Sequence, residues 1–300
     1  MFVPESTTKC QWTSLADACA AFVKAETGVQ GSHHIRPLHW HVACRLVIEG
    51  GFMPDEIKPH PPFRVEEGKN GPRLVYDEAK ADNSEATVFG GLKTKDIDVV
   101  VAKEGIGPCL AVSMKGSLNA FRNLTNRLEE AVGDCTNIHI AYPALVYGFL
   151  HVFRANREGP IPKIGSGFLK ADAKTGNLLA ADTAVTKTGE VTDFIRNYAA
   201  AMARLTGRGD LRNDVSRYET IALLMLNLEN PVGGVFDAYP AFDSALRFDG
   251  FFKTLVDQYD LRFVYGAPML KSVTRRAFWA KDSPVMGDGR MQDFIPRVAD

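Results

Sequence analysis

The sequence predicts an α/β fold with a mixed central sheet flanked by helices, and three neighbouring patterns near the middle of the chain predict it. Residues 96–102 (DIDVVVA) and 109–115 (CLAVSMK) are short apolar runs separated by a glycine-containing turn, which is typical of a β-hairpin. A polar helix is expected over about 117–132, ended by Gly133, and residues 137–141 (NIHIA) are expected to form another strand. Strands on both sides of a helix indicate a layered α/β core.

Two helices are expected in the N-terminal part of the chain. The first spans residues 14–28, with Ser14 as its N-cap and Gly28 as its end. The second spans about 37–49, because apolar residues share one stripe there and two glycines follow it. Residues 53–72 contain five prolines and are therefore expected to be mostly irregular.

The second half of the chain continues this alternation. Helices are expected at 191–205, where apolar residues recur on one face, and at 251–258. Residues 220–228 (TIALLMLNL) are a strongly apolar strand candidate, although a buried helix would show the same pattern, and 262–265 is a second strand candidate. The Gly-, Lys- and Ala-rich residues 156–188 are expected to form a mobile loop.

Composition narrows the protein class without deciding the function. The 300 residues are 45% hydrophobic and 24% charged, which is ordinary for a globular protein, and the net charge of −1 neither indicates nor excludes nucleic-acid binding. Five widely spaced cysteines without a CxxC pair indicate reduced thiols in a cytoplasmic protein. We expect no membrane association, because residues 1–11 lack an apolar signal region and no apolar run reaches spanning length.

Acidic and basic residues on the predicted hairpin indicate phosphodiester chemistry. Asp96 and Asp98 lie two apart and share one face of their strand, as do Ser113 and Lys115 on the next. Pairing of the strands can bring an acid and Lys115 to the same end of the sheet. Carboxylates hold Mg²⁺ for phosphodiester hydrolysis, and a nearby cation contacts the phosphate or the attacking water. The pattern D…(D/E)xK would place a second acid where this chain has Ser113.

A second acid can come from the helix that follows the hairpin. Glu129 lies fourteen residues after Lys115, and Glu130 is next to it. Arg122 and Glu129 are seven apart, nearly two helical turns, and so share a face. If that face looks back at the hairpin, Glu129 can reach the space that Ser113 leaves. The alternative is that these acids only form surface ion pairs with the helix arginines.

Asp98, the Ser113-Met114-Lys115 triplet and Glu129 together resemble the motif of a known family. They are similar to a subgroup of PD-(D/E)XK restriction endonucleases whose catalytic glutamate has moved to the helix. The intervening SLNAFRNLTNRLEE also resembles theirs, with Arg122 and Arg127 at spacings where that family places arginines. Relatives of this kind recognise sites with a CCGG core.

The resemblance covers about residues 94–132 and has departures within it. The family often has a further arginine and an acid just before the matched arginine, where this chain has Asn119 and Phe121. Its metal-binding aspartate commonly follows proline, whereas Lys95 precedes Asp96 here. Three valines after Asp98 favour Asp98 as the ligand and leave Asp96 as the alternative.

The resemblance implies a homodimeric type II restriction endonuclease that cuts double-stranded DNA with Mg²⁺ and leaves 5′-phosphate ends. It implies one domain over 1–300 with a PD-(D/E)XK core at about 90–230, and DNA-recognition or dimerisation elements in 1–75 and 231–300. The alternatives are a non-specific repair or defence nuclease and a catalytically dead DNA-binding protein on the same fold.

The resemblance also implies the roles of individual residues. Asp98 and Glu129 would bind the metal, with Asp96 and Glu130 as alternatives. Lys115 would orient or activate the attacking water, and Ser113 would fill the vacated ligand position. The predicted DNA contacts are Asn119, Arg122, Asn126 and Arg127.

Two further groups of residues remain without an assigned role. His33, His34, His39 and His41 suggest a metal cluster, but His39 and His41 are two apart and diverge on a helix, which argues against zinc. Lys271, Arg275 and Arg276 near Trp279 form a small basic patch that could contact a DNA backbone or could simply be solvated.

Overall fold

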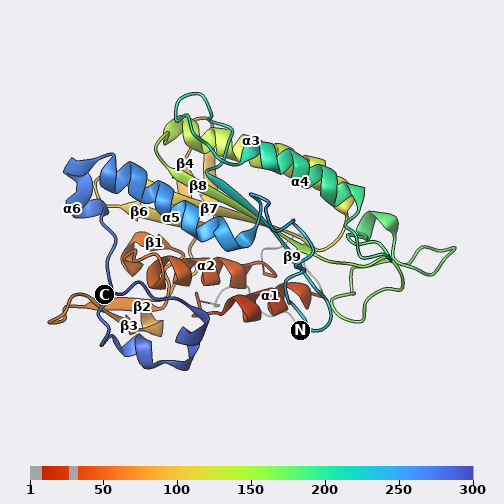
Figure 1. Ribbon diagram of the computed structural model, residues 1–300, viewed down its shortest axis with the longest axis horizontal. Helices are drawn as coiled ribbons and strands as arrows, with labels where there is room; N and C mark the ends of the chain where they lie inside the picture. The colour runs from red at the N-terminus through yellow and green to blue at the C-terminus, as the bar shows by residue number, and fades with distance from the viewer. Residues whose placement is uncertain (1–8, 27–32, 300) are drawn as a thin grey trace.

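A computed structural model describes residues 9–26 and 33–299 (Figure 1). Its centre is a five-stranded sheet in the order β1-β6-β7-β8-β9. The strands are β1 (Ile57–Lys58), β6 (Val99–Lys103), β7 (Gly107–Ser117), β8 (Val146–Arg154) and β9 (Thr220–Leu226). The β1–β6 and β6–β7 pairs are antiparallel, whereas β7–β8 and β8–β9 are parallel. The expected α/β fold with a mixed sheet is therefore correct.

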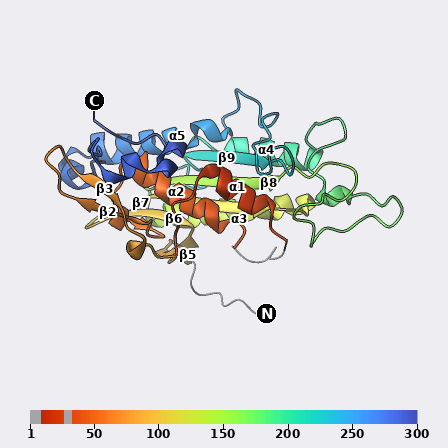
Figure 2. The ribbon, with the colours of Figure 1, turned by 90° about the horizontal axis from the view of Figure 1, so that it is seen from below.

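Helices cover both faces of this sheet (Figures 1 and 2). α1 (Leu15–Val23), α2 (Arg36–Ile48) and α5 (Phe251–Tyr259) pack on one face, and α3 (Leu124–Ala141) and α4 (Asp193–Leu205) on the other. Alternation along the strands divides the core accordingly, because successive side chains point to opposite faces. Val99 and Val112 join the first cluster, and Val100 and Ala111 join the second.

The predicted hairpin is present as β6 and β7. Val99 pairs with Val112, and the turn between the strands uses Gly105 and Gly107, both with positive φ. Glycine adopts this left-handed backbone without the steric cost that other residues incur. The strand expected over 96–102 is not continuous, however, because Asp98 separates β5 (Thr94–Ile97) from β6.

The helix after the hairpin differs from the prediction at both ends. It begins at Leu124, after a 3-10 turn at Phe121–Asn123, and continues to Ala141, so residues 137–141 are helical and not a strand. Gly133 does not end it. A glycine costs a helix about 1 kcal/mol relative to alanine, but buried Ala131, Cys135 and Ile138 continue the sheet-facing stripe on both sides of Gly133. The following strand is β8, which is buried throughout.

The later predictions are mostly confirmed. α4, β9 and α5 form where helix, strand and helix were expected. The strand expected at 262–265 is wrong: α5 continues directly into a π-helical segment, Asp260–Tyr265. Its Phe263 and Val264 are buried side by side, and a short apolar run of this kind does not distinguish strand from helix.

The N-terminal helices also form where expected. The Ser14 hydroxyl accepts a hydrogen bond from the backbone N–H of Asp17 and caps α1. The predicted end at Gly28 lies outside the described residues. Residues 53–72 are mostly irregular, as expected; their regular elements are a 3-10 turn at Pro54–Glu56, β1, and β2 (Phe63–Glu66), which pairs with β3 (Arg73–Tyr76).

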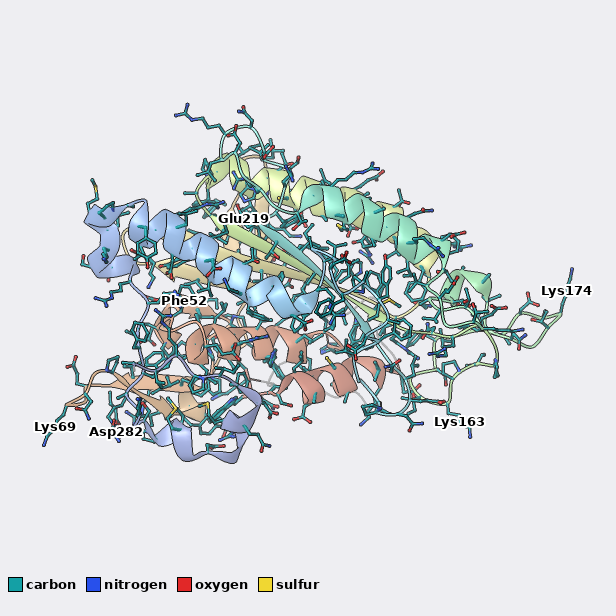
Figure 3. The ribbon with its side chains drawn as sticks, in the orientation of Figure 1. Phe52, Lys69, Lys163, Lys174, Glu219 and Asp282 are labelled. Atoms are coloured by element: carbon teal, nitrogen blue, oxygen red, sulfur yellow. The ribbon has the colours of Figure 1, made fainter. Side chains whose placement is uncertain are left out.

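β4 (Ala86–Phe89) pairs with β5 in a separate hairpin. A short helix, α6 (Lys271–Thr274), lies near the C-terminal end of the chain. Residues 156–188 contain little regular structure beyond a 3-10 turn at Ala180–Asp182. They extend from one end of the molecule, with Lys174 at the tip (Figure 3). Their mobility stays a prediction.

Candidate metal centre

Asp98 lies at the junction of two antiparallel ladders. On one side, Ala86 pairs with Ile97 in the β4–β5 hairpin, so the next position outward sets Glu85 opposite Asp98. On the other side, Val99 pairs with Val112, so the next position sets Ser113 opposite Asp98. The backbone N–H of Met114 donates to Asp98 Oδ2 over 2.7 Å. One carboxylate oxygen is thus held by the sheet, and the other can face a different partner.

The β4–β5 hairpin is fixed to α3, which sets the position of Glu85. Asn137 Oδ1 accepts hydrogen bonds from the backbone N–H groups of Leu92 (2.8 Å) and Lys93 (3.0 Å), and its amide donates back to the Lys93 carbonyl. Lys95 forms an ion pair of 2.6 Å with Asp134 on the same helix. These contacts, together with the one-residue connection to β6 at Asp98, hold the hairpin beside the sheet.

Three metal-ligating side chains converge at this junction. One ligand atom each from His39, Glu85 and Asp98 lies within 4.8 Å of the others. His39 comes from α2, and its Nε2 is 3.5 Å from Asp98 Oδ1. His39 is 2% exposed, and its Nε2 has no hydrogen-bond partner. Glu85 is exposed and Asp98 half-buried, so the group opens to solvent on the carboxylate side.

The electrostatics of His39 favour a neutral ring. Burial lowers the pKa of His39, and the positive charges of Arg36 and Lys115 lower it further, against the opposing effect of Asp98 and Glu85. A neutral imidazole keeps a lone pair for a metal, whereas a protonated one does not. The two carboxylates of this donor set suit Mg²⁺ or Mn²⁺, whereas the buried imidazole nitrogen favours a transition metal.

Lys115 lies on β7, beside β6, and Ser113 of the same strand is directed away from the donor group. Lys115 is half-buried on β7, and its charge affects the pKa of both His39 and His151, its cross-strand neighbour. Ser113 is buried, and its hydroxyl lies 2.7 Å from the Tyr147 hydroxyl. Ser113 is thus engaged with the sheet.

The other predicted acids lie apart from the donor group. Glu129 is exposed on α3 and makes no hydrogen bond or ion pair within the described part of the chain. Glu130 pairs with Arg127 over 2.9 Å on the same surface. Asp96 is exposed on β5 and accepts a hydrogen bond from the Thr87 hydroxyl. The acid beside Asp98 is Glu85, which the sequence pattern did not identify.

The predicted DNA-contacting residues are accessible at the start of α3. Arg122, Asn126 and Arg127 are exposed, and Asn119 is half-buried. Nothing in their geometry assigns them a partner, and their roles stay predictions.

Comparison with protein-family models finds none that matches the chain, and comparisons with curated proteins and with solved structures find no significant match. The function therefore has to be argued from the site. Among the described helices, none is long and apolar enough to cross a membrane.

The four histidines noted in the sequence do not form one cluster. His41 Nδ1 lies 3.1 Å from the Thr13 carbonyl, and its ring packs against Phe294, away from His39. His33 is exposed, and His34 packs beside Phe22. His39 alone joins the carboxylates, as the divergence of side chains two apart on a helix predicts.

The sequence carried one signal that could have identified Glu85. Residues 86–89 and 94–97 are short segments flanking Gly90-Gly91, a pattern that indicates a hairpin. Pairing them would have set Glu85 opposite Asp98. His39 had no comparable signal, because its approach to Asp98 depends on how α2 packs on the sheet.

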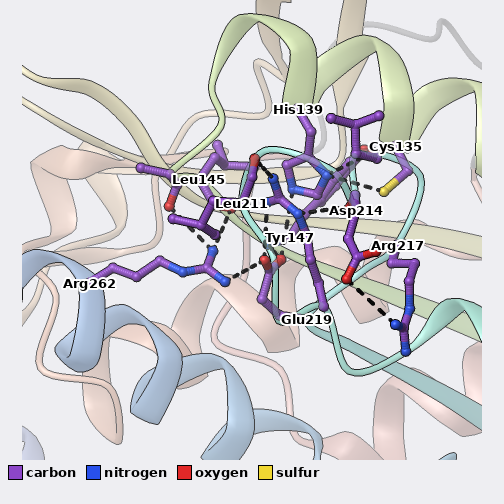
Figure 4. Close-up of polar contacts among 12 residues, drawn as sticks. Cys135, His139, Leu145, Tyr147, Leu211, Asp214, Arg217, Glu219 and Arg262 are labelled. Carbon is purple, nitrogen blue, oxygen red and sulfur yellow. Dashed lines mark hydrogen bonds and ion pairs between the residues drawn. The ribbon is translucent and has the colours of Figure 1, made fainter.

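A second polar cluster lies at the start of β9 (Figure 4), and its Arg208 and Glu219 side chains are closed to solvent. Glu219 is fully buried between Arg208 and Arg262, at 3.2 and 2.7 Å, and accepts the backbone N–H of Tyr147 at 2.6 Å. Because its charges are paired within the protein, this cluster serves to join β8, β9 and the segment after α5. Through Tyr147 it also connects to Ser113.

Proposed function

We propose that this protein is a divalent-metal-dependent DNA endonuclease with a PD-(D/E)XK core. The observation that carries the proposal is the convergence of His39, Glu85 and Asp98 at the base of the β6–β7 hairpin, with Lys115 on the adjoining strand. In its specific form the proposal is a homodimeric type II restriction enzyme that uses Mg²⁺, cuts double-stranded DNA and leaves 5′-phosphate ends.

Three features support the nuclease assignment. The order hairpin, crossover helix α3 and parallel strand β8 agrees with the core that the sequence resemblance implies. Asp98 immediately precedes β6, and Lys115 lies on β7, which pairs with β6; the D…xK pattern likewise places its acid and its lysine beside each other on a hairpin. Glu85 provides the second carboxylate that Ser113 cannot, and its exposure leaves that side accessible to a large substrate.

The residues of the site have separable tasks. A divalent cation, when bound, would neutralise charge on the scissile phosphate and lower the pKa of a coordinated water. Asp98, oriented by the Met114 N–H, together with Glu85 and neutral His39 would hold that cation. The Lys115 ammonium would orient the attacking water and stabilise negative charge on the phosphate.

The test is digestion of several plasmids by purified protein with Mg²⁺ or Mn²⁺. We expect discrete fragments from the wild type and none from Asp98→Asn or Lys115→Ala, while both variants still bind DNA in Ca²⁺. Asp96→Asn is the matched control, because Asp96 lies two positions from Asp98 but is hydrogen-bonded to Thr87, and it should cut normally.

The other outcomes of this digestion select among the alternatives. A smear of products would favour a non-specific nuclease on the same core. Binding without cleavage in either metal would favour a catalytically inactive DNA-binding protein, which the engagement of Ser113 with Tyr147 supports. A protein that neither binds nor cuts DNA would refute the proposal.

A further inference from the structure

A pocket with a strong positive charge lies at the end of the molecule that carries α6, opposite the end formed by residues 156–188 (Figure 1). We call it the cationic pocket. Its volume is about 300 Å³, within the range of small-molecule sites. The charged and aromatic residues that line it include Lys271, Arg275, Arg276, Arg297, Asp260 and Tyr265.

The one carboxylate of the pocket is already engaged. Asp260 accepts two hydrogen bonds from the Arg276 guanidinium, at 2.9 and 2.6 Å, and Arg276 is itself buried. This bidentate pair forms one wall of the pocket. It leaves no acid of the lining for the remaining three cations.

Those three cations converge without a carboxylate partner. Lys271 and Arg275 are four apart in and just after α6, so they share a face, and neither side chain has a hydrogen bond or ion pair within residues 9–26 and 33–299. Arg297 is held by the Ala277 carbonyl and by the Phe278 ring, whose centroid is 3.9 Å from its Cζ. These two contacts fix the position of Arg297, and neither of them neutralises its charge.

The crowding of these cations has an electrostatic cost. Burial lowers the pKa of Arg297, and the charges of Arg276 and Arg275 lower it further, while Asp260 and Tyr265 oppose the effect. A group of neighbouring like charges raises the local concentration of counter-ions, and a bound anion would relieve their mutual repulsion. Phosphate suits such a site, because guanidinium groups bind its oxygens through charge-assisted hydrogen bonds.

Aromatic rings beside the cations narrow the ligand class. Tyr265 is 68% exposed and Phe278 39% exposed, and both line the pocket. Exposed rings next to basic side chains are the combination that binds nucleotides, through base stacking and phosphate contacts. We propose that the cationic pocket binds a nucleotide unit, with its phosphate among Lys271, Arg275 and Arg297 and its base against the rings. The unit is either free or part of a nucleic-acid strand.

The test is calorimetric titration of the full chain at low salt without divalent metal, so that it does not depend on the proposed nuclease activity. The probes are thymidine monophosphate, inorganic phosphate, thymidine and a short single-stranded oligothymidylate. We expect the nucleotide to bind more tightly than inorganic phosphate, and thymidine not to bind. Lys271→Gln with Arg275→Gln should weaken nucleotide binding by at least about tenfold, because two charge-assisted contacts are lost.

Lys271 and Arg275 are both exposed, so we expect their replacement by glutamine to leave folding unchanged. Lys253→Gln is the matched control: it removes an exposed lysine of α5 that pairs with Asp257 outside the pocket. If only the oligothymidylate binds, and the double variant weakens it while Lys253→Gln does not, the nucleotide unit belongs to a nucleic-acid strand. If no phosphate-bearing probe binds, or if the double variant binds as the wild type does, the proposal is wrong. Equal binding of nucleotide and inorganic phosphate would refute the part assigned to the rings.

Discussion

At the residue scale, the position of Asp98 between two antiparallel ladders determines which side chains it meets. The Met114 N–H holds one of its oxygens, and the other faces the unpartnered Nε2 of His39. Glu85 reaches the same place through the register of the β4–β5 hairpin. The sequence pattern proposed Asp98 and Lys115, which lie next to and on the two strands of one hairpin, and it assigned the second carboxylate to Glu129.

Replacing either Glu85 or Glu129 with glutamine tests which of the two carboxylates binds the metal. We expect Glu85→Gln to weaken Mn²⁺ binding by at least about tenfold, because a charged ligand is lost, and to reduce cleavage with it. Glu129→Gln should leave both unchanged, because Glu129 lies exposed on α3. Metal binding is measured by calorimetry and by Mn²⁺ electron paramagnetic resonance. The reverse result would restore the helix glutamate as the ligand.

At the scale of elements, segments stabilised by local pattern were predictable and those positioned by tertiary contacts were not. α4 and β9 follow from apolar periodicity and from a buried run, respectively. Gly133 was expected to end α3, but the helix continues past it. The packing of Cys135 and Ile138 outweighs the loss of helix stability that this glycine causes. The docking of the β4–β5 hairpin depends on Asn137, which the prediction placed in a strand.

Asn137 offers a test of this docking. Asn137→Ala removes three hydrogen bonds to the β4–β5 turn, and we expect a loss of about 1–3 kcal/mol in the free energy of unfolding in urea. Hydrogen exchange of the Leu92 and Lys93 amides should become faster, and Mn²⁺ should bind more weakly because Glu85 is less firmly placed. Asn126→Ala, on an exposed turn of the same helix, is the control. Unchanged exchange at Leu92 and Lys93 would show that the hairpin is held by other contacts.

At the scale of the whole molecule, buried neutral histidines lie on both sides of the central sheet. Burial lowers the pKa of His41 to about 4 and that of His139 to about 3, and it also lowers the pKa of His39 and His151. The unfolded chain takes up these protons near pH 6.5, whereas the folded chain does not. The corresponding stability is complete above pH 6.5 and is lost as the pH falls toward the folded values.

We therefore expect the free energy of unfolding to fall between pH 6.5 and pH 5, by up to about 1.4 kcal/mol per pH unit for each buried histidine. Urea unfolding at several pH values in this window measures the slope, above the range where carboxylates titrate. The His41→Gln variant should show a shallower slope, because one neutral buried imidazole is gone. A stability that rises as the pH falls through this window would contradict the assignment.

The position of Asp98 between two ladders has a consequence for how the protein matures. A slip of one residue in either hairpin would reverse the direction of every side chain on the slipped strand. A misregistered molecule would then lack the cluster of His39, Glu85 and Asp98, even with all its helices formed. Nascent or damaged copies of the chain would therefore lack the candidate metal centre, which would form only after both ladders had closed in register.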